Sequence, residues 1–212
     1  YFLWYTRSIM KTIKAIFSDR GLRNRIFFVL GILVITRILA IVPIPEIDAS
    51  KLGGLLKGDG FLGLLNIITG GGIASFSIVM LGVGPYITSS IIMQLSTVLS
   101  PRLKEMYQEE GDIGRRRFVQ YGRIISLPLA IMQGFALLTL LVRKNVIPEM
   151  SSVDMTFNIL IITAGTMLMM WLGEQINERG IGNGVSLIIF AGIVAALPQS
   201  LAQYFATFSV QD

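Results

Sequence analysis

Long apolar blocks alternate with short polar stretches along most of this sequence. The blocks cover residues 26–43, 76–100, 122–142, 155–173 and 184–205. About 20 apolar residues cross the hydrocarbon core of a bilayer as a helix, and helices satisfy their own backbone hydrogen bonds in lipid. The pattern therefore predicts an all-α, polytopic membrane protein with five transmembrane helices.

The stretches outside these blocks are interpreted from their composition and position. Residues 1–9 precede Met10 and are read as a tag or an upstream extension, 10–25 as a cytoplasmic N-terminal segment, and 206–212 as an external tail. The sequence leaves open whether the chain is a natural fragment, a partial gene product or part of a longer protein. A reading frame that continues past Asp212 would decide this.

The second block contains its own interruption. Gly82, Gly84 and Pro85 lie inside it, and a glycine-rich run, residues 69–72, precedes it. Proline removes one helical hydrogen bond, and backbone groups freed in lipid need protein or a water-filled cavity as partners. Two structures fit this pattern. One is a broken helix that lines a pathway, with residues 61–76 as a short re-entrant segment; the other is an ordinary kinked span after a flexible loop.

Composition narrows the possible functions. Hydrophobic residues make up 53% of the 212 positions and charged residues only 15%, which is too little charge to cover a soluble domain of this length. The chain has no cysteine and no histidine. Disulfides, thiolate metal sites and histidine general bases are therefore excluded, and no nucleophile or metal cluster is evident. We expect no enzyme activity, no metal and no cofactor.

Basic residues gather on one side of the predicted membrane. They lie before the first block, between the second and third, and between the fourth and fifth: Arg7, Lys11, Lys14, Arg20, Arg23, Arg25, Arg102, Lys104, Arg115, Arg116, Arg117, Arg123 and Arg179. The opposite side has only Lys51, Lys57, Arg143 and Lys144. By the positive-inside rule, the N-terminus is cytoplasmic and the C-terminus external. This placement explains the net charge of +5 without direct nucleic-acid recognition.

Two other functional classes fit less well. An ion-coupled transporter usually places acidic or histidine residues at membrane depth, and no carboxylate falls well inside a predicted span. The run Gly180–Gly184 looks like a phosphate-binding loop, but it follows a membrane helix rather than a strand and has no Walker lysine. We interpret it as a tight cytoplasmic loop in which Asn183 or a neighbour caps the fifth helix.

Four motifs resemble the SecY family of protein-conducting channels. They are Pro43–Pro45, Leu81–Leu95, Glu110–Arg117 and Met170–Gly184. They occur in the order and loop positions of the family, and the resemblance extends from Met10 to about Leu201. It implies that this chain is one half, spans one to five, of an inverted-repeat channel whose second helix is broken and preceded by a re-entrant plug.

The resemblance also implies roles for individual residues. The hydrophobic pore ring would receive Val83, Ile87, Val185 and Ile189, and Thr88 and Gln133 would contribute to the polar patch of the lateral gate. The plug, about residues 61–75, would include Leu64, Leu65, Asn66, Ile67, Gly70, Gly71 and Gly72. Arg115, Arg116 and Arg117 are weaker candidates for contact with cytoplasmic partners.

The function implied is passive conduction of unfolded preproteins, with lateral release of membrane segments into the cytoplasmic membrane. The expected partners are SecE and SecG, SecA and the ribosome, signal sequences, the lipid bilayer and the missing C-terminal half of the channel. Five spans would form only half of the pore.

Overall fold

The computed structural model describes residues 19–44, 66, 69, 72–73 and 75–208. Its elements are all helices in these ranges: α2 (Arg20–Leu39), α5 (Gly84–Leu99), α6 (Pro101–Gln108), α7 (Gly111–Arg143), α8 (Ser152–Arg179) and α9 (Gly184–Phe208). The all-helical class expected from the hydrophobic pattern is thus found in the described residues.

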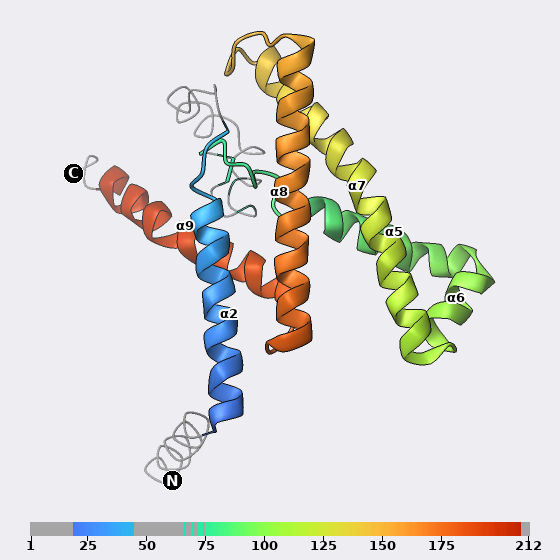
Figure 1. Ribbon diagram of the computed structural model, residues 1–212. Coiled ribbons are helices and arrows are strands. Elements are labelled where there is room, and N and C mark those ends of the chain that lie inside the picture. The colour runs from blue at the N-terminus through green and yellow to red at the C-terminus, as the bar shows by residue number, and fades with distance from the viewer. Residues whose placement is uncertain (1–18, 45–65, 67–68, 70–71, 74, 209–212) are drawn as a thin grey trace.

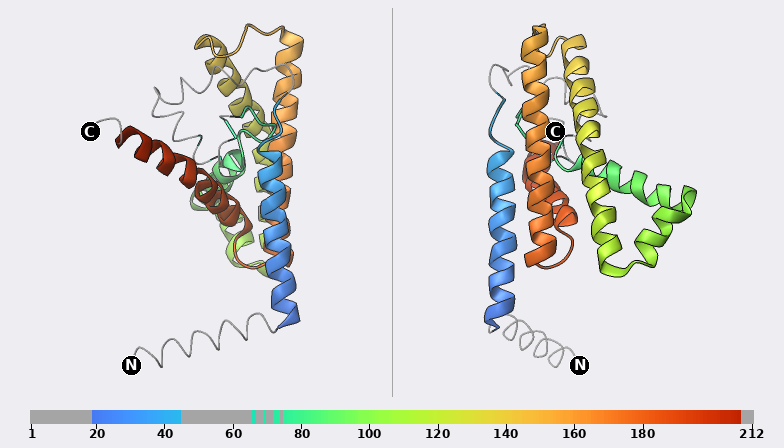
Figure 2. Two further views of the ribbon diagram at one scale, coloured as in Figure 1. Left: turned by 90° about the vertical axis from the view of Figure 1, so that its left-hand side faces the viewer. Right: turned by 45° about the vertical axis from the view of Figure 1, so that its right-hand side comes forward.

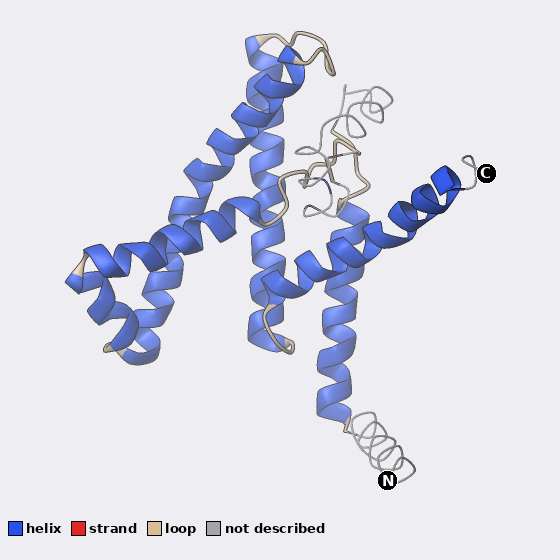
Figure 3. Cartoon of the chain, turned by 180° about the vertical axis from the view of Figure 1, so that it is seen from behind, coloured by secondary structure: helices blue, strands red, loops and turns tan. Residues whose placement is uncertain are grey.

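Three helices run side by side and two cross them. Figures 1 and 2 show α2 and α8 alongside each other in opposite directions, with α7 leaning on the other side of α8. The helix α5 crosses α7 obliquely, and α9 rises away from the lower end of α8, as Figure 3 shows from behind. The lower ends of α7, α8 and α9 therefore lie on one side of the molecule, together with the start of α2.

The helices differ from the predicted spans mainly at their ends. By length and apolar character, α7 and α8 qualify as membrane spans, and Gly184–Pro198 forms a shorter apolar helix segment. The helix α7 begins at Gly111, well before the apolar block at residue 122, whereas α2 ends at Leu39, before the end of the first block at residue 43. The remaining spans of the five-helix topology stay a prediction.

The interruption in the second block is a true helix start. The helix α5 begins at Gly84 with Pro85 in its first turn, where the missing N–H needs no partner. Residues 75–83 form turns, and Gly82 has a φ of 56°, which favours glycine. An uninterrupted kinked helix through this block is therefore excluded. Residues 61–65, 67–68, 70–71 and 74 lie outside the described residues.

A short backbone bridge joins the end of α2 to the turns before α5. The Ile44 N–H donates to the Phe76 carbonyl at 2.8 Å, and the Ile78 N–H donates to the Val42 carbonyl at 3.0 Å. Phe76 is fully buried and has a φ of 44°, an unusual conformation for a bulky residue. The chain before residue 45 and the chain after residue 75 are thus held together.

Two hydrophobic clusters lie along the helices. The Phe76 cluster contains the buried residues Ile44, Phe76, Met80, Leu138, Leu141, Val146, Ile147 and Ile162. The Val83 cluster contains Ile32, Ala40, Val79, Val83, Met169, Leu172, Ile176 and Ile188. Ile78 packs against both. Gly165 of α8 permits this arrangement, because a side chain there would collide with the Ile78 carbonyl.

The polar stretch between the second and third blocks is more ordered than expected. It contains α6 and the first turns of α7, which form a hairpin. Gly114 lies against the carbonyl of Met106, so that a Cβ could not fit between the two helices. The Tyr107 and Phe118 rings pack with their centroids 4.8 Å apart. These apolar contacts, which hydropathy alone did not indicate, hold α6 against α7.

Candidate functional site

The residues proposed for the pore ring come from the first turns of α5 and α9. Val83 is the N-cap of α5, and the Ile87 N–H donates to the Val83 carbonyl at 3.0 Å, one turn on. Val185 and Ile189 have the same spacing at the start of α9. Val83 belongs to the Val83 cluster, and the other three pack against it. The structure therefore brings all four residues to one hydrophobic cluster.

The start of α9 is fixed by a tight loop. Gly182 has a φ of 80°, the Gly184 N–H donates to Asn177 Oδ1 at 2.7 Å, and the Ser186 N–H donates to Asn183 Oδ1 at 3.2 Å. Asn183 thus caps α9, as predicted. Gly184 lies directly against the Gly173 carbonyl of α8. The glycines of this motif serve chain reversal and close packing.

Val185 and Ile189 differ in their surroundings. A Cβ on Gly173 would lie 3.3 Å from Val185 Cγ2, so the Val185 side chain faces α8. Ile189, one turn further along, is half-buried. Val185 therefore contributes to the packing of α9 on α8, and both residues are half-buried beside the Val83 cluster.

The two lateral-gate candidates lie at different levels. Thr88 is half-buried on α5, and its hydroxyl donates to the Gly84 carbonyl at 3.1 Å. Its neighbour Ser89 donates to the carbonyl of Gly122 on α7. Gln133 is half-buried about three turns further along α7 than Gly122. Thr88 and Gln133 therefore belong to two helices that pack against each other, α5 and α7.

Only Asn66 and Gly72 of the plug candidates fall within the described residues; Leu64, Leu65, Ile67, Gly70 and Gly71 lie outside them. The Asn66 carbonyl accepts from the Thr69 hydroxyl at 3.2 Å. Gly72 is buried, and its carbonyl accepts from the Ser77 N–H at 3.0 Å. Thr69 lies within about 4 Å of where a side chain on Gly82 would begin. The described part of this segment therefore packs beside the start of α5.

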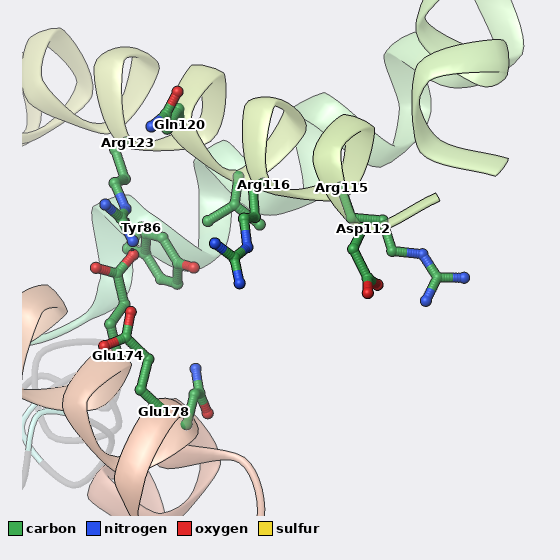
Figure 4. Close-up of a pocket in the computed structure, with 10 residues that line it drawn as sticks. Tyr86, Asp112, Arg115, Arg116, Gln120, Arg123, Glu174 and Glu178 are labelled. Atoms are coloured by element: carbon green, nitrogen blue, oxygen red, sulfur yellow. Dashed lines mark hydrogen bonds and ion pairs between the residues drawn. The ribbon is translucent and has the colours of Figure 1, made fainter. Parts of the chain in front are cut away.

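The three consecutive arginines do not form one patch. Successive helical residues point in different directions, and Arg117 makes an exposed ion pair with Glu110 at 4.0 Å. Arg115 and Arg116 instead line an open pocket of about 880 Å³ between the ends of α7 and α8 (Figure 4). The other residues lining it are Tyr86, Asp112, Val119, Gln120, Arg123, Glu174, Asn177 and Glu178.

An ion pair at the inner end of this pocket was missed by sequence reasoning. Arg123 Nε lies 2.6 Å from Glu174 Oε1, and the Glu174 side chain is only 9% exposed. Topology held a signal for it: Arg123 begins the third predicted span and Glu174 follows the fourth on the same side of the membrane. Opposite charges at equal depth on successive helices favour pairing.

Comparison with known proteins identifies relatives over most of the chain. The model of the SecY family matches residues 77–211. Proteins named "Protein translocase subunit SecY" are 41% identical in Synechocystis sp. over 92% of this chain, 46% in Vibrio cholerae over 86%, and 45% in Escherichia coli K12 over 85%. The aligned part is 44%, 42% and 42% of those relatives, so the chain spans less than half their length.

Solved structures agree on the fold. The Sec61 chain of the canine ribosome–channel complex from the endoplasmic reticulum matches 78% of this chain and 35% of its own length, with a TM-score of 0.54 and 22% identity. A structure described as a protein conducting channel matches 78% of this chain and 34% of its own, with a TM-score of 0.53 and 22% identity. With the family match and the similarity of sequence, these results show that the chain belongs to the SecY family.

Proposed function

We propose that this chain forms one wall of a membrane channel that passively conducts unfolded preproteins and releases membrane segments sideways into lipid. The observation that carries the proposal is the convergence of Val83, Ile87, Val185 and Ile189 on one hydrophobic cluster, in a chain of the SecY family. The relatives' name, protein translocase subunit, supports the same activity.

The proposed ring closes the channel because apolar side chains repel water and ions. A constriction lined by isoleucine and valine dewets when narrow, whereas a polypeptide can push the side chains apart. Ile87 and Ile189 are half-buried and retain surface for this role. Val83 and Val185 contribute to the ring while also packing against their own half.

The segment before α5 is proposed as the plug, and the outer face of α5 as part of the lateral gate. Thr69 beside Gly82 supports the first assignment, since it brings this segment to the start of α5. For the gate, Thr88 of α5 and Gln133 of α7 would both contribute to the polar patch, together with residues of the other half. The C-terminal half of the channel would supply the opposite wall.

The proposed location is the cytoplasmic membrane, with the N-terminus in the cytoplasm. The lower ends of α7 and α8, with Arg115 and Arg116 in their pocket, then face the cytoplasm, where SecA or the ribosome drives transport. SecE would clamp the two halves, and SecG would complete the complex. Signal sequences would enter between the halves, toward the bilayer.

Polar substitution in the ring tests the proposal. Ile87→Asn or Ile189→Asn, introduced into the complete channel protein with its partner subunits, should increase ion conductance in planar bilayers without any preprotein. The reason is that an amide stabilises water in the constriction. Phe190→Asn is the matched control, because Phe190 is 63% exposed on the same helix.

Unchanged conductance in both ring variants would contradict the ring assignment. Deleting residues 61–75 should leave preprotein transport active but raise the resting conductance. A deletion variant whose resting conductance equals that of the parent channel would contradict the plug assignment.

A further inference from the structure

We infer that Arg123, Glu174 and the Tyr86 ring form a polar junction that positions the first turn of α5, and with it Val83 and Ile87, in the closed channel. The inference rests on the proposed function, because it assigns positioning residues to the proposed ring. It concerns three helices that meet at the inner end of the pocket in Figure 4.

The ion pair fixes α7 to α8 at this level. Arg123 Nε donates to Glu174 Oε1 at 2.6 Å, and the side chains are 40% and 9% exposed, respectively. A buried carboxylate is costly unless a cation or hydrogen-bond donors compensate it. Separating α7 from α8 would leave Glu174 in that costly state, so the pair favours a single spacing of the two helices.

The same part of α7 contacts α5 at two points. Tyr86 lines the pocket beside the Arg123–Glu174 pair (Figure 4). Ser89, three residues later and on the same face of α5, donates its hydroxyl to the carbonyl of Gly122. Gly122 and Arg123 are adjacent in the chain, so the position of the ion pair is transmitted directly to α5.

Tyr86 immediately precedes Ile87, and Val83 lies one turn before Ile87 on the same helix. A shift of Tyr86 therefore moves both α5 members of the proposed ring. The other two members belong to α9, whose start is fixed to α8 by Asn177. The junction thus sets the α5 residues relative to the α8–α9 unit.

Arg123 and Glu174 differ in how deeply they are buried. The inference therefore predicts different effects for the two single substitutions. Loss of the arginine leaves a buried carboxylate without compensation, whereas loss of the carboxylate leaves an arginine that already reaches the pocket. Arg123→Gln should therefore disturb α5 more than Glu174→Gln. The double variant should restore the resting state, because no unpaired charge remains.

The test uses the complete channel protein with its partner subunits in planar bilayers. Arg123→Gln should raise the resting ion conductance roughly tenfold, equivalent to about 1.4 kcal/mol in the open–closed equilibrium. Glu174→Gln should have a smaller effect, and the double variant and the exchange R123E/E174R should approach the parent value. The exposed Arg117–Glu110 pair supplies the control, since Glu110→Gln should leave conductance unchanged.

A second readout does not depend on conduction. Spin labels at Ile91 of α5 and Leu168 of α8, both exposed sites, report the separation of the two helices. The chain has no cysteine of its own to interfere with labelling. Arg123→Gln should broaden or shift this distance distribution, and the exchange variant should restore it.

The outcomes separate the inference from the proposed function. If Arg123→Gln lowers the folded yield but leaves both conductance and label distance unchanged, the junction is only structural and the inference is wrong. A shifted distance in a protein whose ring variants never alter conductance supports the junction and overturns the proposed ring. Equal effects of Arg123→Gln and of the double variant would also contradict the inference.

Discussion

The Phe76 cluster and the Val83 cluster consist of similar side chains but differ in how deeply these side chains are buried. No buried member of the Phe76 cluster exceeds 3% exposure, and residues 146–147 after α7 and the backbone bridge at Phe76 cover it. Partly buried hydrophobic residues border both clusters, but the buried members of the Val83 cluster reach 8% exposure, and Ile87 and Ile189 are among the residues at its border. The Phe76 cluster is therefore the more deeply buried of the two, while the Val83 cluster includes or borders the residues of the proposed ring.

This difference distinguishes two properties to which a hydrophobic cluster can contribute, the free energy of unfolding and conduction. A deeply buried cluster contributes to the free energy of unfolding, because its side chains are close-packed and the loss of one leaves a cavity. A cluster with available apolar surface can contribute to conduction, because its contacts can change without unfolding the helices. Substitutions should therefore alter stability in the first cluster and conductance in the second.

The largest expected effect is the loss of Phe76. Phe76→Ala should lower the free energy of unfolding by about 3–5 kcal/mol, because it leaves a cavity in a fully buried site. Thermal unfolding in detergent measures the change. Phe27→Ala on the exposed face of α2 is the control, and an equal loss of stability there would remove the distinction between the two sites.

A smaller effect is expected where the clusters meet. Gly165→Ala places a Cβ against the Ile78 carbonyl, and overpacking of this kind costs about 1–3 kcal/mol. Because Ile78 packs against both clusters, this variant should reduce the melting temperature and raise resting conductance together. Gly31→Ala is the matched control, since a Cβ there meets nothing within 4 Å. A change in only one property would mean that the clusters are not coupled through Ile78.

Loss of the α9 cap should affect the Val83 cluster alone. Asn183→Ala removes the acceptor for the Ser186 N–H, which costs about 1 kcal/mol for an N-cap. Asn183→Asp retains the acceptor and should behave like the parent protein in thermal unfolding. If both variants melt alike, the cap does not contribute to the stability of α9.

The smallest effect is expected outside both clusters. Glu110 and Arg117 form an exposed ion pair at 4.0 Å, and such pairs contribute at most about 1 kcal/mol. Glu110→Gln should therefore leave both the melting temperature and the resting conductance nearly unchanged. A large change in either would assign this pair a role that its exposure does not indicate.

Sequence periodicity predicted the helical class and the approximate helices because hydropathy blocks are long and local. It also indicated an interruption at Gly84 and Pro85, where α5 begins, because both residues act through their own backbone, but it left a kinked span as the alternative. It missed α6, whose contact with α7 depends on Gly114 approaching Met106. Hydropathy does not encode such a contact between α6 and the polar first turns of α7.

The candidate site likewise has features that the sequence predicted and features that it did not. The resemblance implied the four ring residues, and the four-residue spacing within each pair agrees with one helix face, which is a local property. The orientation of Val185 toward Gly173 could not be foreseen, since it depends on how α9 leaves α8. The pairing of Arg123 with Glu174 likewise requires two helices to be placed in register.

The helix α7 is longer than the crossing of a bilayer core requires. A helix of 33 residues is about 50 Å long, whereas the hydrocarbon core of a bilayer is about 30 Å thick. The part of α7 that exceeds this thickness packs against α6 at Gly114. From there to Gly122 the chain is continuous helix. A displacement of α6 would therefore be transmitted along α7 to Gly122, whose carbonyl accepts the hydrogen bond from Ser89 of α5.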